Sequence, residues 1–392
     1  MLALLFALIL SYGAFRFANG FNGGAGVAGP VEIRANPRFR VERGEVGEAG
    51  RRHPEPLPQA LAPLWETRVG SPCFLAASGD LLLAASAGGE VLALDAGKRT
   101  QIWRYDAGGW ITSSPVIAGG RVFFGSSSGL IHALDAASGV VAWSFDAGGE
   151  VLSTPVVCGG RLYVAVDMGM TSAVHCLEAE GGRRIWTHHS HGWVASPPAC
   201  AARSLHFGTY DREAVALNIV TGKRAWAEDT GRVVFASPVV EGDVVYYVSI
   251  DGKVQALRAE DGAQLWEREL QEFIWQAPLA AGEALMLATY ERSIYALDRR
   301  TGEVLWRVGL GQPIEQPLLG VGETAYAFTS TGGIYRISTD EGKVLGAWRL
   351  AEAPWTPPLL AGGRVYVSSR DGYLRAYGEP LPAGIGEPLS GE

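Results

Sequence analysis

The chain has 392 residues, of which 47% are apolar, and its 33 lysines and arginines against 41 aspartates and glutamates give a net charge of −8. Charges of both signs are scattered along it, so the basic footprint that nucleic acid requires is missing and we expect no nucleic-acid partner. The four cysteines form no CxxC and no adjacent pair. This argues against a zinc ribbon, a covalent haem and a disulfide scaffold.

An apolar run from Leu2 to Phe15 opens the sequence. It is short for a membrane span and typical of the apolar region of a signal peptide. Because no lysine or arginine precedes it, an uncleaved anchor that associates the chain with a membrane stays an alternative, and a buried core helix is a third. We predict a signal peptide or N-terminal anchor over residues 1–20, and an exported protein that is periplasmic or attached to the cell envelope.

Residues 21–63 are rich in glycine, proline, arginine and glutamate. Such a segment cannot bury enough apolar surface to offset the entropy lost on ordering. We therefore expect a flexible arm, either a simple tether or a segment that wraps around a partner. Residues 379–392 are expected to form a C-terminal tail.

A repeat of about 40 residues occupies residues 64–378. Its fullest copy runs from Ala296 to Trp306, where Asp298 can bond the amides of a tight turn and Gly302 can take a positive φ. Each copy ends on a large apolar residue, and these tryptophans are Trp65, Trp103, Trp143, Trp186, Trp226, Trp266, Trp306 and Trp348. We interpret them as core residues, and truncation of one to alanine should cost about 3–5 kcal/mol.

Between successive tryptophans, three turns separate four short alternating strands, which predicts a four-stranded antiparallel meander. A single meander leaves one face unburied, so the copies must stack, and radial stacking gives a propeller. Eight Ser-Pro-like pairs give the number of blades: Ser71-Pro72, Ser114-Pro115, Thr154-Pro155, Ser196-Pro197, Ser237-Pro238, Ala277-Pro278, Gln316-Pro317 and Thr356-Pro357. The prediction is an all-β, eight-bladed propeller, closed by the strand around Trp65 as the outer strand of the last blade.

The combined pattern of Ser-Pro, Gly-Gly-Arg-Val-Tyr-Val (residues 362–367) and Ala-Leu-Asp-x-x-Thr-Gly-x-x-x-Trp (residues 296–306) resembles the PQQ-like repeat family of quinoprotein-type propellers. The resemblance implies that the repeat tryptophans dock neighbouring blades. Three copies depart from the pattern: the first has Gly97-Lys98-Arg99-Thr100 in place of Thr-Gly, the third has Leu177-Glu178, and the seventh has an extra residue before Trp348.

Two branches of this family suggest different functions. Quinoprotein dehydrogenases are similar in fold but carry long insertions, calcium-ligating carboxylates, a catalytic aspartate and adjacent cysteines. The minimal blades of this chain are more similar to the BamB group of outer-membrane assembly factors. That resemblance implies a noncatalytic exported scaffold with a protein partner in the cell envelope, no cofactor and no metal. The alternatives are a quinoprotein-type oxidoreductase or ligand sensor, and an accessory subunit of another envelope complex.

The loops before the Ser-Pro-like pairs emerge on one face of a propeller and vary most between copies. Large aromatic side chains there are candidate anchors for a partner. The candidate partner-binding residues are Trp110, Glu150, Trp193, Phe235, Phe273, Trp275, Glu315 and Trp355. Two alternatives are that these side chains plug the mouth of the central channel, or that they line a small-molecule pocket.

The run from Thr187 to His191 holds three histidines and is expected in one of these loops. It would make only a weak metal site, so we expect exposed loop histidines and predict no metal ligand. Cys158 and Cys176 should lie on the first and third strands of one blade, about 9.5 Å apart, which is too far for a disulfide. Cys158 and Cys200 occupy matching places in neighbouring blades. No phosphate-binding loop, catalytic triad or paired carboxylates stand out, so no catalytic residue is predicted.

Overall fold

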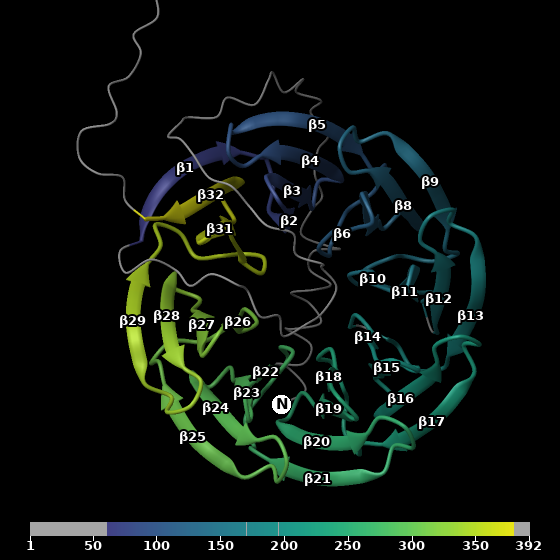
Figure 1. Cartoon of the computed structure of the whole chain (residues 1–392), viewed down its shortest axis with the longest axis vertical. Helices are drawn as coiled ribbons and strands as arrows, with labels where there is room; N and C mark the ends of the chain where they lie inside the picture. Colours follow the sequence, from purple (N-terminus) through teal and green to yellow (C-terminus); the bar gives the residue numbers. More distant parts are fainter. Residues whose placement is uncertain (1–60, 170, 195, 380–392) are drawn as a thin grey trace, which may run out of the picture. The chain divides into compact units, whose positions relative to one another are not determined.

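The computed structural model describes residues 61–169, 171–194 and 196–379, which all belong to one compact unit of the chain. These residues form 32 strands in eight four-stranded antiparallel sheets, and this part of the chain contains no helix and therefore no helical membrane span. Figure 1 shows the sheets following one another as the blades of a propeller. The predicted fold is confirmed. The predictions for residues 1–20, for most of the 21–63 arm and for the tail after Glu379 fall outside the described residues.

Each blade runs from an inner to an outer strand. Blade 1 has β2 (Cys73–Ser78), β3 (Leu81–Ser86), β4 (Glu90–Asp95) and β5 (Thr100–Asp106); blade 2 has β6 (Val116–Ala118), β7 (Arg121–Gly125), β8 (Leu130–Asp135) and β9 (Val141–Asp146); blade 3 has β10 (Val156–Cys158), β11 (Arg161–Asp167), β12 (Ser172–Glu178) and β13 (Arg184–Ser190); blade 4 has β14 (Ala199–Cys200), β15 (Ser204–Gly208), β16 (Glu213–Asn218) and β17 (Arg224–Asp229).

The second half repeats this order. Blade 5 has β18 (Val239–Glu241), β19 (Val244–Val248), β20 (Lys253–Arg258) and β21 (Gln264–Glu269); blade 6 has β22 (Leu279–Ala281), β23 (Ala284–Ala288), β24 (Ser293–Asp298) and β25 (Val304–Gly309); blade 7 has β26 (Leu319–Val321), β27 (Thr324–Phe328), β28 (Gly333–Ser338) and β29 (Val344–Arg349); blade 8 has β30 (Leu359–Ala361), β31 (Arg364–Ser368), β32 (Tyr373–Gly378) and β1 (Ala62–Arg68).

The first strand of the propeller closes the ring. β1 pairs antiparallel with β32, with Trp65 opposite Ala376. An ion pair from Arg375 Nε to Glu66 Oε2, 3.0 Å long, crosses the same two strands. Because β1 and β32 come from opposite ends of the propeller sequence, their pairing joins the two ends, and the predicted closure is confirmed.

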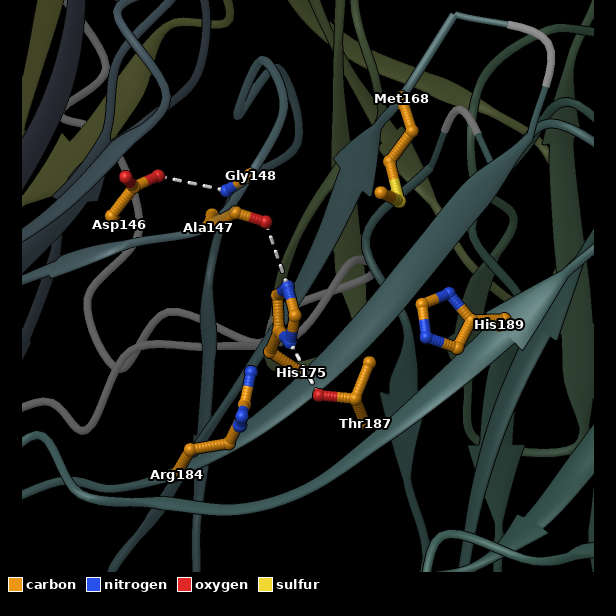
Figure 2. A pocket seen from close by; sticks show the side chains of 8 residues that line it. All are labelled: Asp146, Ala147, Gly148, Met168, His175, Arg184, Thr187 and His189. Atoms are coloured by element: carbon orange, nitrogen blue, oxygen red, sulfur yellow. Dashed lines mark hydrogen bonds between the residues drawn. The ribbon is translucent and has the colours of Figure 1, made fainter.

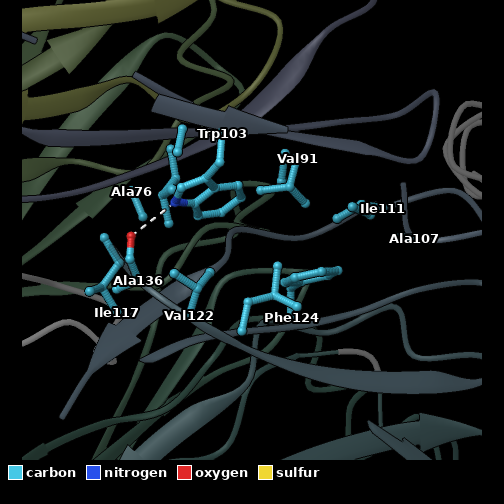
Figure 3. Packing of buried hydrophobic residues seen from close by; sticks show 13 residues of the cluster. Ala76, Val91, Trp103, Ala107, Ile111, Ile117, Val122, Phe124 and Ala136 are labelled. Atoms are coloured by element: carbon cyan, nitrogen blue, oxygen red, sulfur yellow. Dashed lines mark hydrogen bonds between the residues drawn. The ribbon is translucent and has the colours of Figure 1, made fainter. Parts of the chain in front are cut away.

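Blades are joined by tryptophans of the outer strands. Trp103 on β5 packs into a cluster with Val91, Ile111 and Phe124, and its Nε1 donates to the carbonyl oxygen of Ala136 in blade 2 at 3.0 Å (Figure 3). The same bond recurs at 2.9–3.3 Å for Trp143 to Ala179, Trp186 to Ile219, Trp226 to Ala259, Trp266 to Arg299 and Trp306 to Thr339. These tryptophans therefore supply both apolar burial and a directed bond between neighbouring blades.

Blade 7 departs from this pattern. In blade 6 the repeat tryptophan pairs with an alanine of β24, but in blade 7 the corresponding position is Gly346, opposite Arg336. Trp348 lies two residues further along β29, opposite Ile334. A Cβ on Gly346 would lie 3.0 Å from Trp348 Cη2, so the indole folds back over the glycine and contacts the Tyr326 ring. The expectation that Trp348 occupies the repeat position is therefore wrong in register, because its ring reaches that space from two residues away.

Candidate functional site

The candidate site is the set of loops that lead from the outer strand of one blade to the inner strand of the next; we call this set the loop face. All eight predicted partner-binding residues lie in these loops. Each one directly precedes or follows a residue that is buried in the propeller. Trp110, Glu150, Trp193 and Phe273 precede the buried residue, and Phe235, Trp275, Glu315 and Trp355 follow it.

Backbone hydrogen bonds fix these loops to the turn between the second and third strands of the blade that they enter. The amide of Ser127 donates to the Trp110 carbonyl oxygen at 2.8 Å, and the amide of Tyr210 donates to that of Trp193 at 3.0 Å. The amide of Tyr290 donates to the Phe273 carbonyl oxygen at 2.9 Å. The loop side chains are therefore presented from the rigid ends of sheets rather than from long free loops.

Aromatic side chains form small groups on this face. The rings of Trp193 and Tyr210 lie 4.7 Å apart, and those of Trp275 and Tyr290 lie 4.9 Å apart. The guanidinium of Arg370 lies 3.9 Å from the centroid of the Trp355 ring, which is 40% exposed. These contacts hold each ring against its own blade while leaving part of it in solvent.

The turn residues that support these rings were not among the predicted site residues. Tyr210 and Tyr290 occupy equivalent turns, after β15 and β23. A sequence signal was present, because residues 209–212 and 289–292 both read Thr-Tyr-acid-Arg. The closing arginine of each turn has a positive φ, 68° at Arg212 and 77° at Arg292, which marks a tight turn.

Side chains from one loop also bind the backbone of the next. Gln276 Nε2 donates to the Glu315 carbonyl oxygen at 2.5 Å, and Thr356 Oγ1 donates at 2.6 Å to the carbonyl oxygen of Cys73, where the loop into blade 1 has just become β2. Gln316 Nε2 donates to the carbonyl oxygen of Pro354 at 3.4 Å. These bonds join successive loops, so a partner that contacts several loops meets a connected surface.

A partly buried carboxylate, that of Glu272, orders the loop that carries Phe273 and Trp275. Glu272 accepts from Tyr295 Oη at 2.6 Å, from Thr289 Oγ1 at 2.6 Å and from Arg307 Nη2 at 2.7 Å. Burial, together with the bond to Glu272, raises the pKa of Tyr295 to about 12. With its lone pairs occupied in this way, Glu272 holds the loop in place.

The histidine run does not lie in a loop as expected. Thr187, His188 and His189 belong to β13, and His191 follows the strand. The alternation of buried and exposed residues continues past Trp186, so His188 packs on Phe207 while His189 faces solvent. Among the described residues, no group of three or more histidine, cysteine, aspartate or glutamate side chains could hold a metal ion. Cys158 and Cys176 lie on the first and third strands of blade 3, as predicted.

An open hollow of about 570 Å³ lies at the rim, between the end of β9 and strands β12 and β13 (Figure 2). His175 forms its inner wall, with Nε2 donating to the Ala147 carbonyl oxygen at 3.0 Å and Nδ1 accepting from Thr187 Oγ1 at 2.8 Å. Burial lowers the pKa of His175, and the nearby Arg184 lowers it further. With both ring nitrogens bonded, this histidine has no free lone pair for a metal or a substrate proton.

The comparisons with known proteins agree with this geometry. The family described as "Beta-alanine-activating enzyme, beta-propeller" matches residues 67–378. The chain belongs to this family. No curated protein matches the chain in sequence.

Solved structures with the same fold come from proteins with different activities. BamB from Moraxella catarrhalis is 21% identical to this chain, with a TM-score of 0.69. The match covers 82% of this chain and 100% of the BamB chain. The quinohemoprotein alcohol dehydrogenase ADHIIG from Pseudomonas putida HK5 is 14% identical, with a TM-score of 0.67. That match covers 86% of this chain and 80% of the dehydrogenase chain. A europium-containing methanol dehydrogenase is 13% identical, with a TM-score of 0.68, and the match covers 82% of this chain and 94% of the dehydrogenase chain. At these identities the likeness concerns the fold, and it confirms the PQQ-like propeller for this member of the family.

Proposed function

We propose that the chain is a noncatalytic scaffold that binds a protein partner through the loop face. The observation that carries the proposal is the exposure of Trp110 and Trp355, both 40%, on loops fixed by backbone hydrogen bonds. The fold does not need these rings in solvent, and rigid aromatic side chains supply large contact area at low entropic cost. Trp193, Phe235, Phe273 and Trp275, which are half-buried, extend the surface, with Glu150 and Glu315 as its acidic members.

The setting that we propose is the cell envelope, with a role similar to that of BamB in outer-membrane protein assembly. The apolar run after Met1 supports export, and the likeness to BamB supports a propeller that acts through contacts. A signal peptide or N-terminal anchor and a periplasmic location belong to this proposal. The family description names the propeller of an enzyme, so a role beside a catalytic partner is consistent with it.

The described residues do not fit the calcium-bound quinone that the resemblance to quinoprotein dehydrogenases implies. That group needs a set of carboxylate ligands, and the described part of the chain gathers no such set. We therefore derive no quinone chemistry for this chain.

The proposal is tested by comparing partner capture between surface variants of the full chain. Trp110→Ser with Trp355→Ser should remove most partner binding, because it removes two anchors. The matched control is Val140→Ser with Leu305→Ser, of which the first directly precedes the outer strand of blade 2 and the second lies on the outer strand of blade 6; both residues are exposed. All four changes are on the surface and should leave the melting temperature nearly unchanged. Equal capture by both double variants would contradict a partner site on the loop face.

A further inference from the structure

Blade 8 has a leucine where blades 2 to 7 have the glycine that docks the preceding blade. In blade 6 that glycine is Gly302, which lies beneath Trp266 of blade 5 and two residues before Val304, the first residue of β25. The pairing of β1 with β32 has the same register as that of β25 with β24, and it places Pro63 at the position of Val304. The residue at the position of Gly302 is therefore Leu61.

Blade 7 has the complementary change. The position of the repeat tryptophan is taken by Gly346, and the indole of Trp348 covers this glycine from two residues away. Leu61 and Trp348 are both partly buried and pack against the same apolar cluster, which contains Tyr377 of blade 8. The large side chain and the glycine have thus changed places across this junction, and the N-terminal arm enters the propeller here.

A hollow of about 280 Å³ opens beside Gly346 and is lined by Arg336, Leu345, Gly346, Ala347 and Trp348. Leu345 is 42% exposed. Arg336 Nε is buried and has no hydrogen-bond acceptor among the described residues. Because a guanidinium only donates, the group that completes the hollow must be an acceptor. The hollow therefore suits a segment that brings both an apolar side chain and hydrogen-bond acceptors.

The seven residues before Leu61 have this chemistry, since they read Pro-Glu-Pro-Leu-Pro-Gln-Ala. The prolines at positions 54, 56 and 58 have no amide hydrogen and favour an extended polyproline II conformation, whose carbonyl oxygens are not bonded within the segment. Leu57 supplies the apolar side chain, and the Glu55 carboxylate is a further acceptor. Grooves lined by aromatic side chains are common binding sites for proline-rich segments of this kind.

We propose that residues 54–60, the end of the N-terminal arm, dock in this hollow, with Leu57 against Leu345 and Trp348 and a backbone carbonyl oxygen accepting from Arg336 Nε. Leu57 precedes Leu61 by four residues and reaches at most about 14 Å from it. The docked segment takes the place of the turn between third and fourth strands that blade 8 lacks. It also shortens the part of the arm that acts as a tether to residues 21–53.

The C-terminal tail is the other segment of the chain with a Pro-Leu-Pro sequence, at residues 380–382. Gly378 pairs with Ala62, so the tail leaves the propeller at the same corner of blade 8. Glu379, which precedes the Pro-Leu-Pro sequence, is exposed, whereas Leu61 already packs against the cluster that Trp348 borders. This difference favours the arm as the occupant of the hollow.

A double-mutant cycle on the full chain, measured by thermal unfolding, tests the docking. Leu57→Ser should lower the melting temperature by about 2–4 °C, because the leucine loses its apolar contacts. If Leu57 lies against Leu345, this loss should be at most half as large in the Leu345→Ser background. The matched control is Leu381→Ser, which changes the leucine of the Pro-Leu-Pro sequence in the tail and should leave the melting temperature unchanged.

An unchanged melting temperature in Leu57→Ser would overturn the proposal and leave the hollow to a partner. Equal losses with Leu and with Ser at position 345 would also overturn it, because Leu57 would then dock elsewhere. A loss in Leu381→Ser that depends on Leu345 would show that the tail fills the hollow instead of the arm. This inference does not depend on the scaffold function, and its readout needs no partner.

Discussion

Gly302 lies directly beneath the indole of Trp266 from the preceding blade: a Cβ on this glycine would lie 2.4 Å from Trp266 Cε3, and its φ is 71°. The same arrangement recurs with closest contacts of 2.5–2.8 Å at Gly139 on Trp103, Gly182 on Trp143, Gly222 on Trp186, Gly262 on Trp226 and Gly342 on Trp306. The glycine of the Thr-Gly motif therefore meets two requirements, a left-handed turn and space for a neighbouring ring. The repeat motif encodes the junction between blades as well as the turn within a blade.

Gly302→Ala should destabilise the propeller more than Gly119→Ala. Both positions have a positive φ, 71° and 56°, which costs a non-glycine residue about 1–2 kcal/mol. A Cβ on Gly119 meets nothing within 4 Å, whereas on Gly302 it displaces Trp266, which adds about 1–3 kcal/mol. Denaturant unfolding of the two variants measures the difference directly. Equal loss of stability would show that the contact with Trp266 is not tight.

Gly346→Trp should lower the free energy of unfolding by about 1–3 kcal/mol, because the indole of Trp348 already fills that space. Adding Trp348→Val, which copies the arrangement of Trp306 and Val308 in blade 6, should recover most of the loss. A double-mutant cycle measured by denaturant unfolding checks this coupling. Independent effects of the two substitutions would mean that the two side chains do not share the site.

The architecture could be predicted from the sequence because each blade repeats the same turn residues and the same outer-strand tryptophan. Closure followed from the lone strand at Trp65 and the missing fourth strand at the end of the repeat. The register of blade 7 could not be predicted, because a longer interval between Trp306 and Trp348 does not say which residue takes the repeat position. Only the pairing of Gly346 with Arg336 decides it.

The loops that form the candidate site could be located from the sequence, but not all the residues that lie in contact with them could. The Ser-Pro-like pairs located the loops that carry Trp110 and Trp355, since the strand following each pair is the inner one. The supporting turns with Tyr210 and Tyr290 lie in a different part of each repeat, so their contact with the loops depends on how the blade folds. The prediction of a loop for the histidines after Trp186 is wrong, because β13 extends to Ser190.

The stability of the propeller should fall as the pH decreases from about 6.5 to about 4. His206 is fully buried, and its Nε2 shares a hydrogen bond of 2.7 Å with Ser204 Oγ. Burial lowers the pKa of His206 to about 4. A histidine whose pKa is lowered by folding binds its proton preferentially in the unfolded chain, so its contribution is complete above about 6.5 and is lost on acidification. His132, also buried, has its pKa lowered to about 4 for the same reason.

The loss from one such histidine amounts to at most about 3 kcal/mol when the pH has fallen to about 4, and to about 2 kcal/mol at pH 5. Denaturant unfolding at pH 7.5 and pH 5 measures it, and His206→Gln should reduce the difference between the two pH values even if it lowers stability at both. An unchanged difference in His206→Gln would show that another group causes the acid sensitivity.

Removing β1 should prevent stable closure. A chain that begins at residue 61 keeps the pairing of Trp65 with Ala376 and the ion pair of Arg375 with Glu66, so it should unfold cooperatively as a monomer. A chain that begins at residue 69 leaves β32 as an open edge and should lose the cooperative transition or associate with other copies. Size-exclusion chromatography and thermal unfolding compare the two. The same melting temperature for both chains would contradict the closure.

The loop face as a partner site is tested most directly by site-specific photocross-linking in the cells that produce the protein. A photoreactive phenylalanine analogue is placed at Trp110 or Trp355, and at the exposed control positions Val140, directly before β9, or Leu305, on β25. The scaffold function predicts a discrete protein adduct from residues 110 and 355 and none from residues 140 and 305. Adducts from the control positions alone, or from none of the four, would contradict it.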